Sequence, residues 1–258
     1  MLGEVKGLVL RVTNVGESDR LLTIYTEESG IVTAMAKGSR KLKSNTMSAT
    51  LQFCYSSFIL YSKSDKYWIR EATLHESFYG IRNSIEGLAL AGYIVDVLSE
   101  VTTAEADVDL LRLALNSLYA ISEGIADIPK IKAAFEIRSM AILGFMPEVL
   151  ACATCGEREG DFFFDVMAAQ IECHSCHRKR ERTHTTLSEE HESHLIYILS
   201  AGAKLALSYL VYAPLERLYS FSLQPEDMML LSRATEGYLL NHLERSFKTL
   251  EFYNEVKP

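Results

Sequence analysis

The sequence has few cysteines, five in 258 residues, and this number excludes a small scaffold held together by disulfides. It also lacks any apolar run of the roughly 18–20 residues that a membrane-spanning helix needs. The first residues, MLGEVKGLVLRV, alternate in character and contain no signal-peptide core. With 48% hydrophobic residues and one tryptophan, the composition is that of a globular protein, which we expect to be complete, cytoplasmic and without a membrane partner.

The short motifs that mark common catalytic sites are also missing. The sequence has no GxxxxGKS/T phosphate loop, no GxGxxG after a predicted strand and no HExxH motif. It has no GxSxG nucleophile motif either. His191 and His194 have a spacing that can bind a metal on a helix, but no third ligand lies nearby in sequence. These absences favour a binding protein over an enzyme.

Negative charge predominates, with a formal net charge of −8, but it is unevenly distributed. Residues 1–80 contain ten Lys and Arg against eight Asp and Glu, whereas residues 81–258 contain sixteen against twenty-six. Because global charge says little about any one surface, local runs matter more.

The stretch AKGSRKLKS at 36–44, the basic loop, concentrates positive charge. Each phosphate that a Lys or Arg neutralises releases condensed counterions, so a local cluster can bind nucleic acid despite a negative total. A solvated loop without a partner is the alternative. We expect the loop to be mobile. Its four cations are Lys37, Arg40, Lys41 and Lys43. Three further cations extend the predicted DNA-binding patch if their strands face the same way, namely Lys6, Arg11 and Arg20.

The first 78 residues form a predicted domain of five strands. Turn-forming GESD and EESG separate the first runs. Strict alternation puts Leu8, Leu10 and Val12 on one face of the first strand and Val5 and Val9 on the other. Five short strands favour a compact antiparallel barrel, and the OB-fold is the commonest five-stranded kind, with an SH3-like barrel as the alternative. The runs lie at 4–13, 20–27, 30–38, 49–61 and 66–74.

In the fourth run the apolar phase shifts by one residue, which predicts a β-bulge at Ser56 and Ser57. From residue 79 to 258 the apolar period is helical. One helix begins near Pro129 and stops at Gly144, and another resumes at Ser188 as its N-cap. The predicted fold class is therefore α+β and multidomain: a five-stranded barrel, then a mainly α-helical domain with an inserted cysteine segment at about 150–182.

Four cysteines form two Cys-x-x-Cys pairs separated by seventeen residues, which is the spacing of a four-cysteine zinc ribbon. Two thiolates three residues apart on a tight turn can both reach one Zn²⁺, and DFFFDVMAAQIE between the pairs can form a hairpin. Four thiolates leave no open position, so the metal is expected to be structural. Redox pairs and two disulfides are the alternatives. The ligands are Cys152, Cys155, Cys173 and Cys176.

Side chains near the cysteines offer further readings. His174 and His177 can replace a cysteine ligand or be bystanders. RKRER at 178–182 places cations beside the ribbon or forms an ordinary solvated loop. The remaining cysteine, Cys54, lies in an apolar strand pattern and is expected to be a small buried hydrophobe.

Three features occur together in one order: GESDRLLTIYTEESG with AKGSRKLKS, then FEIRSMAILGFMP at 135–147, then the cysteine ribbon. In this combination the chain resembles, over essentially its full length, the bacterial DNA repair and recombination mediator family RecO. The resemblance implies an N-terminal OB-fold, a helical domain and an embedded zinc ribbon. The matching positions are Gly16, Glu17, Asp19 and Arg20, the basic loop with Gly38, and Phe135, Glu136, Arg138, Leu143, Gly144 and Pro147.

The resemblance also implies function: a nucleoid-associated protein that binds single- and double-stranded DNA and anneals complementary strands. It implies contacts with the single-strand-binding protein SSB and with RecR, and help in loading RecA on SSB-coated DNA in the RecF pathway. This chain departs from the pattern in its markedly acidic helical domain, which focuses the DNA hypothesis on the barrel. Some members lack the zinc cysteines, so here the cysteines themselves argue for the metal.

Two partner surfaces follow as hypotheses. Five aromatic residues of the barrel are candidates for stacking on bases, although each fits a barrel core or rim better: Tyr25, Tyr55, Tyr61, Tyr67 and Trp68. An apolar groove edged by cations before the ribbon suits the acidic tail of SSB, unless its stripe fills the helical core: Phe135, Arg138 and Lys132. A protein–protein adaptor with weak DNA affinity is the runner-up function, and a zinc-dependent or redox enzyme is a third.

Overall fold

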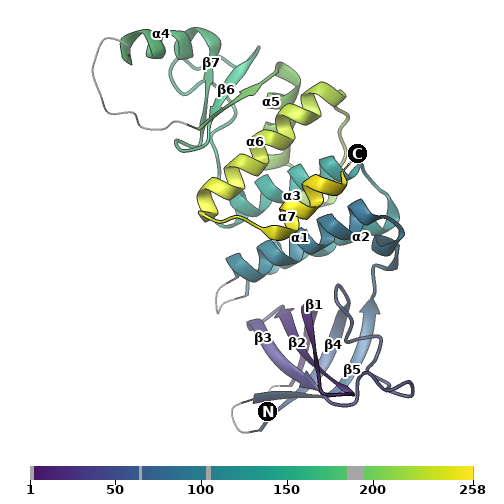
Figure 1. The fold of residues 1–258 in the computed structure, drawn as a ribbon. Coiled ribbons are helices and arrows are strands. Elements are labelled where there is room, and N and C mark those ends of the chain that lie inside the picture. Colours follow the sequence, from purple (N-terminus) through teal and green to yellow (C-terminus); the bar gives the residue numbers. More distant parts are fainter. Residues whose placement is uncertain (1–2, 64–65, 103–105, 185–194, 258) are drawn as a thin grey trace. The chain divides into compact units, whose positions relative to one another are not determined.

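The computed structural model describes residues 3–63, 66–102, 106–184 and 195–257 (Figure 1). They form two compact units, one made of residues 1–124 with 247–258 and the other of residues 125–246. The first unit contains a β-barrel and the helices nearest to it in sequence, together with the C-terminal helix. The second contains the cysteine segment and the helices around it. Ser188, His191 and His194 lie outside the described residues.

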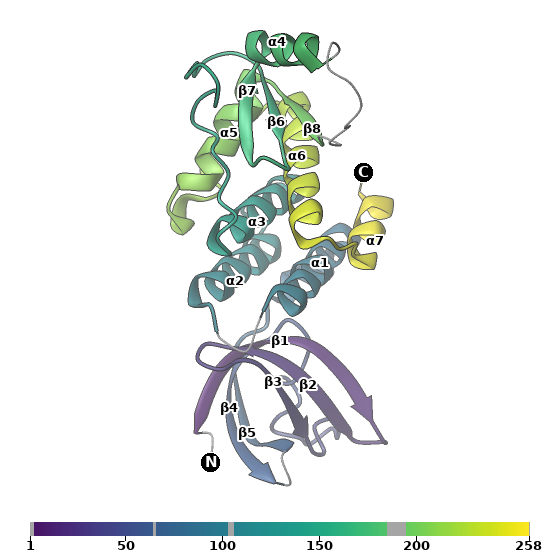
Figure 2. The ribbon, with the colours of Figure 1, turned by 90° about the vertical axis from the view of Figure 1, so that its left-hand side faces the viewer.

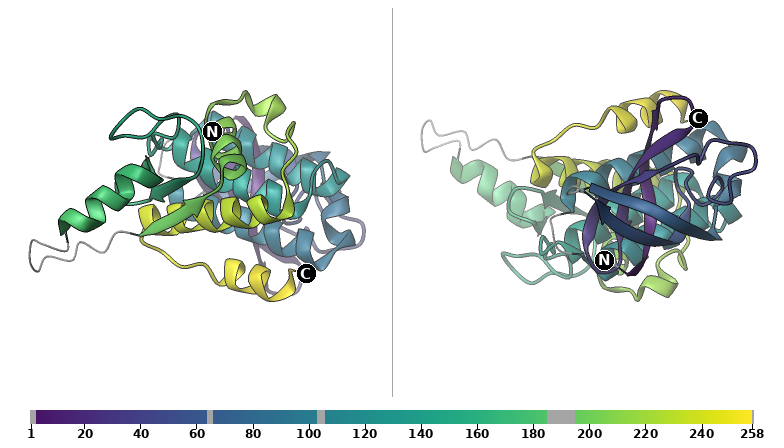
Figure 3. Two further views of the ribbon diagram at one scale, coloured as in Figure 1. Left: turned by 90° about the horizontal axis from the view of Figure 1, so that it is seen from above. Right: turned by 90° about the horizontal axis from the view of Figure 1, so that it is seen from below.

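Five strands close into a barrel in the order β1-β2-β3-β5-β4, and β4 also pairs with β1 (Figure 2; Figure 3, right). Neighbours in this barrel are antiparallel except β3 and β5, which run parallel. This arrangement confirms the predicted OB-like barrel. The strands are β1 Glu4–Val15, β2 Asp19–Thr26, β3 Gly30–Ala36, β4 Tyr55–Lys63 and β5 Lys66–Glu76.

A bulge in β1 changes which residues face the barrel interior. Opposite β2, the register passes from Val9 to Arg11, so Leu10 is an extra residue. Val5, Val9 and Val12 therefore contact one core, although strict alternation assigned Val12 to the opposite face. Leu8 and Leu10 are also buried, outside that core cluster.

The fourth strand is shorter than predicted, because residues 49–53 form turns and β4 begins at Tyr55. The predicted bulge at Ser56 and Ser57 is also wrong: β4 pairs continuously with β1 through both residues. The extra residues lie on β5, where His75 and Arg70 are skipped in the pairing with β4. A bulge on the partner strand shifts the register in the same way, and a single sequence does not tell the two apart.

Three helices complete the first unit: α1 Ile85–Val101, α2 Val108–Glu123 and α7 Lys248–Val256, with the short 3₁₀ turn η1 Tyr79–Asn83 before them. The C-terminal helix packs on α1, where Thr249 Oγ1 donates to Asp96 Oδ2 at 3.0 Å and the ring of Phe247 contacts Tyr93 edge-on. No described helix combines the length and apolarity needed to cross a membrane.

The second unit packs three helices, α3 Ile128–Ile142, α5 Ala201–Tyr212 and α6 Pro225–Leu243, against one another, with η2 Leu215–Arg217 between the last two. A three-stranded sheet in the order β7-β6-β8 contains Cys173 as the last residue of β7, and α4 His174–His184 follows β7 directly (Figure 2). Its strands are β6 Phe162–Asp165, β7 Gln170–Cys173 and β8 Ile196–Leu199. Helix α3 starts and stops as predicted. Strand β8 was predicted as helix, and RKRER is helical, not a loop.

Candidate metal centre and basic loop

Cys152 and Cys155 lie on a tight loop closed by backbone hydrogen bonds. The N–H of Gly156 donates to the Cys152 carbonyl at 2.9 Å, and the N–H of Cys152 donates to the Glu157 carbonyl at 2.7 Å. Gly156 has a φ of 78°, a left-handed conformation that only glycine adopts without steric cost. Gly156 therefore lets the backbone turn back directly after the second cysteine.

The second pair comes from different elements. Cys173 ends β7, and Cys176 lies in the first turn of α4. The predicted hairpin between the pairs is present, because β6 and β7 pair antiparallel. The N–H of Cys173 donates to Cys152 Sγ at 3.2 Å, which ties the second pair to the first.

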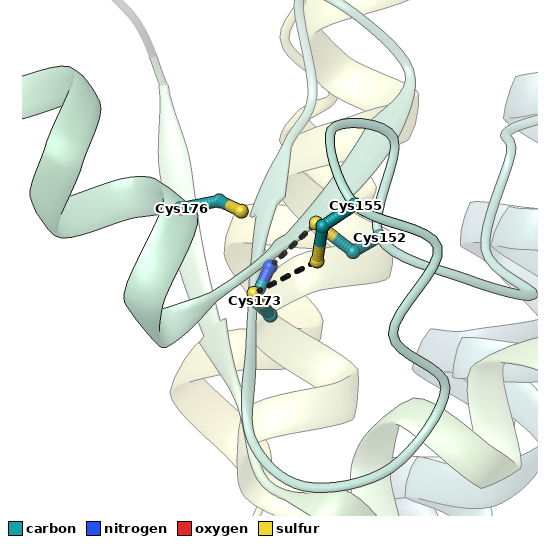
Figure 4. A group of neighbouring side chains, drawn as sticks. All are labelled: Cys152, Cys155, Cys173 and Cys176. Carbon is teal, nitrogen blue, oxygen red and sulfur yellow. Dashed lines mark hydrogen bonds between the residues drawn. The ribbon is translucent and has the colours of Figure 1, made fainter.

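The four sulfur atoms converge on one point (Figure 4). They all lie within 4.8 Å of one another, and Cys155 Sγ and Cys173 Sγ are 3.6 Å apart. In a tetrahedral site with Zn–S bonds of about 2.3 Å, the sulfurs are about 3.8 Å apart. The four thiols, which are free and not joined in disulfides, can bind a metal ion, and their number and spacing are consistent with structural zinc.

The surroundings of the thiols shift their pKa values in opposite directions. A hydrogen bond with the Ser175 hydroxyl, 3.1 Å away, is the main cause that lowers the pKa of Cys173 to about 6. Burial raises the pKa of Cys176 to about 12. Since the thiolate is the metal ligand, binding of a metal at this centre releases the thiol protons.

His174 and His177 do not join the sulfur cluster. The His177 ring stacks on Phe163 with centroids 3.8 Å apart, and the His174 ring lies 5.8 Å from the same phenyl group. Arg180 Nε approaches Glu172 Oε2 at 3.0 Å beside them. Both histidines thus pack on the ribbon as bystanders.

The basic loop is anchored to the turn between β1 and β2. Asp19 Oδ1 accepts a hydrogen bond from the Gly38 N–H at 2.8 Å, and this bond is the main cause that lowers the pKa of Asp19. The Arg40 N–H donates to the Ser18 carbonyl at 3.0 Å, and Arg40 Nη1 donates to the Gly16 carbonyl at 3.1 Å. These bonds explain why a Gly-x-x-Asp turn precedes the loop in sequence, because they tie the backbone of the loop to that turn.

The four cations of the basic loop are all exposed. Lys37 leaves the end of β3 and places its ammonium group 5.3 Å from the centre of the Trp68 ring. Ser39 is instead fully buried and donates to the Ala36 carbonyl. The loop therefore fixes its backbone with small residues and leaves its charged ones to solvent.

The other three predicted DNA-binding cations have different surroundings. Arg20 pairs with Ala36, the first residue of the basic loop, across β2 and β3, and its Nη1 donates to the Met47 carbonyl at 2.9 Å and to Thr50 Oγ1 at 2.8 Å just after the loop. Lys6 is exposed at the other end of β1, next to Ser57 of β4. Arg11 lies 3.7 Å from Asp96 of α1. The structure thus brings only Arg20 to the basic loop.

The three predicted partner-binding residues do not line an exposed groove, which corrects that expectation. Phe135 is fully buried. Lys132, with 1% of its side chain exposed, pairs with Glu136 and Glu236 at 2.7 Å each. Arg138 donates to main-chain carbonyls at the C-terminal end of α5. The apolar stripe of α3 fills the helical core, and Lys132 and Arg138 bind partners inside the second unit.

Sequence reasoning missed the residues that surround the loop in space. Trp68 of β5 comes beside the loop because β5 pairs in parallel with β3, matching Trp68 to Met35. The anchoring role of Asp19 was likewise missed, although the Gly16–Arg20 turn had been singled out. A long-range parallel strand pairing leaves no signal in the local sequence. An acidic residue in a turn before a glycine-containing basic loop does leave one, because it indicates an anchor for the backbone of that loop.

Comparisons with known proteins agree with this architecture. The family model described as Recombination protein O N terminal matches residues 1–78, and Recombination protein O C terminal matches residues 82–251. A DNA repair protein RecO from Acetivibrio thermocellus is 32% identical over 251 residues, which cover 96% of this chain and 95% of the relative. A DNA repair protein RecO from Alkaliphilus metalliredigens is 27% identical over 259 residues, which cover 99% of this chain and 100% of the relative.

Both halves of the chain match the family in order, and the match to the relatives runs nearly end to end. The closed OB-like barrel lies in the first matched region, and the four-cysteine cluster lies in the second. The chain therefore belongs to the RecO family of DNA repair proteins.

Proposed function

We propose that this protein binds DNA through the basic loop of its barrel, anneals complementary strands and acts as a recombination mediator. One observation carries this proposal: four exposed cations lie within seven consecutive positions of a loop whose backbone is held by hydrogen bonds to the neighbouring turn. A preorganised cationic loop loses less conformational entropy on binding phosphates than a flexible one.

Annealing by such a surface requires no chemical catalysis. Two strands repel each other through their phosphates, and a cationic surface concentrates them while it screens that repulsion. We therefore propose that the protein acts without an enzymatic step. Its proposed partners are SSB, through the SSB C-terminal tail, RecR, and indirectly RecA, which it helps to load on SSB-coated single-stranded DNA. The proposed location is the cytoplasm, in association with the nucleoid.

We also propose that the metal of the four-cysteine centre is Zn²⁺ with a structural role. Cys152, Cys155, Cys173 and Cys176 would hold it, and the ion would cross-link the loop at 152–155, strand β7 and helix α4. The closed donor set supports a structural ion, because no ligand position is left for water or substrate.

The decisive experiment is fluorescence anisotropy of a labelled single-stranded oligonucleotide across a salt series. The test variant changes Arg40, Lys41 and Lys43 to Glu. The matched control makes the same change in charge at three exposed cations outside the loop, at Arg217, Arg233 and Lys248. Each lost phosphate contact on a single strand lowers the steepness of log K against log salt by about 0.7, so the loop variant should be shallower by about 2.

The loop variant should also bind at least about tenfold more weakly than wild type at low salt, while the control stays near wild type. Equal weakening in the two variants would mean that total charge, and not the basic loop, governs binding. If both variants bind like the wild type, the loop has no part in DNA binding. In that case the adaptor function, which depends on protein partners, is favoured.

A further inference from the structure

A row of large side chains crosses the outer face of the barrel. Leu21 of β2 pairs with Met35 of β3, Met35 with Trp68 of β5, and Trp68 with Tyr61 of β4. Because side chains alternate along a strand, this row points away from the core. The row is partly open to solvent, and Tyr61 is 38% exposed. The next residue in sequence, or the one before, belongs to the core in each strand: Leu22, Ala34, Ile69 and Leu60.

Cations flank this row on both sides. Lys37 follows Met35 by two residues, and its ammonium group lies 5.3 Å from the centre of the Trp68 ring. On the other side, Lys63 and Lys66 lie directly opposite each other at the ends of β4 and β5. Two like charges in facing positions destabilise a strand pair. A bound phosphate would relieve that repulsion, so the pair suits an anionic ligand.

Trp68 contributes less to the fold than a buried indole usually does. Its Nε1 atom is buried, yet among the described residues it has no hydrogen-bond acceptor. Buried indole N–H groups usually find a partner. The barrel therefore gains no hydrogen bond from the indole N–H of Trp68.

We propose that Tyr61 and Trp68 form a stacking platform for unpaired bases, with Lys37 on one side and the Lys63–Lys66 pair on the other contacting the adjoining phosphates. This inference rests on the proposed DNA binding and assigns it a preference. Every base offers an aromatic face, so such a platform accepts any sequence of single-stranded DNA. In a duplex the bases are already stacked and cannot reach it. The basic loop, by contrast, serves either form through phosphates.

The chain's only tryptophan is Trp68, so intrinsic fluorescence reports on the platform directly. We would titrate the full-length protein with oligo(dT) and, separately, with a duplex of equal length. Oligonucleotide binding by anisotropy would be compared for wild type, Tyr61→Ala and Trp68→Phe. Tyr119→Ala is the matched control, because Tyr119 lies on α2 and is 48% exposed. Trp68→Phe keeps an aromatic ring in the barrel, so the variant retains most of the apolar surface of this position.

Oligo(dT) is expected to quench the tryptophan fluorescence and the duplex is not. Tyr61→Ala should lose about tenfold in affinity for oligo(dT), with an unchanged salt slope because no charge is removed, and keep its affinity for the duplex. Trp68→Phe should bind oligo(dT) between wild type and Tyr61→Ala. If DNA binds with a steep salt slope, but the fluorescence does not change and Tyr61→Ala behaves like Tyr119→Ala, the platform is refuted and DNA binding by the basic loop stands. A wild type that binds neither form overturns both.

Discussion

Replacing Lys132 by Met tests whether the interior of the second unit depends on a charge network. The Lys132 ammonium group is almost fully buried between two carboxylates, 2.7 Å from Glu136 Oε1 and 2.7 Å from Glu236 Oε2. Glu136 is completely buried, and its Oε2 also accepts a hydrogen bond from Thr235 Oγ1 at 2.8 Å. Burial lowers the pKa of Lys132, but the two carboxylates outweigh it and raise that pKa above its ordinary value. The lysine therefore stays charged.

Removing one partner of a buried ion pair leaves a buried charge without compensation, which costs about 3–5 kcal/mol. We expect Lys132→Met to lower the free energy of unfolding of the second unit by this amount. Lys248→Met on the exposed face of α7 should change stability by no more than about 0.5 kcal/mol. Adding Glu136→Gln to Lys132→Met removes the stranded charge and should recover about 2 kcal/mol. Urea denaturation followed by far-UV circular dichroism measures all three variants.

The destabilisation should also depend on pH. Burial raises the pKa of Glu136, and in Lys132→Met the ammonium group that opposed this effect is gone. The folded variant then binds a proton that the unfolded chain releases near pH 4.3, so its stability falls as the pH rises above that value. The loss relative to wild type should be larger at pH 8 than at pH 5. A loss below about 1 kcal/mol at pH 8, or one that is equal at both pH values, would refute the reasoning.

Three further predictions follow from local geometry. Cys173→Ser should reduce the metal content measured by mass spectrometry below one ion per chain and lower the unfolding midpoint of the second unit. Oligonucleotide binding by the barrel should persist. If the variant retains a full equivalent of metal, Cys173 is not a ligand. Asp19→Asn should speed amide exchange at Gly38 and weaken oligonucleotide binding by less than tenfold, with the same salt slope. In the wild type, folding lowers the pKa of Asp19, so the basic loop should loosen only in acid, below the ordinary pKa range of a carboxyl group. Gly80→Ala should destabilise the first unit in thermal unfolding, since a Cβ there would lie 2.0 Å from the Ser122 carbonyl oxygen, and an unchanged melting temperature would show that the η1 turn relaxes freely.

Several features were accessible from local sequence because their signals lie within a few residues. Two Cys-x-x-Cys pairs at ribbon spacing indicated the metal centre, and the structure brings their four sulfurs together. Gly144 ends the region of α3 with a φ of 93°, as its position after an apolar stripe predicted. Alternating apolar residues indicated the barrel strands. These are properties of single elements, so no knowledge of distant partners is needed.

Other features depend on which segments meet. Lys132 and Arg138 look like surface cations in sequence, but the approach of α6 and α5 supplies a carboxylate and carbonyl groups that hold them inside the unit. The bulges of β5 arise from its pairing with β4. Helix α7 packs on α1, which lies more than a hundred residues earlier in the chain, and the composition of α7 does not predict this contact.

The order of barrel, helices and ribbon, the four cysteines that could bind a metal and the charge of the basic loop could all be read from the chain alone. The anchoring of the loop by Asp19, and the row of Trp68 and Tyr61 beside Lys37, became visible only in the folded protein. The difference lies in the range of the interactions. Periodicity, turn chemistry and ligand spacing act between neighbours along the chain, whereas burial, ion pairing and strand register are set by contacts that form only when distant segments pack.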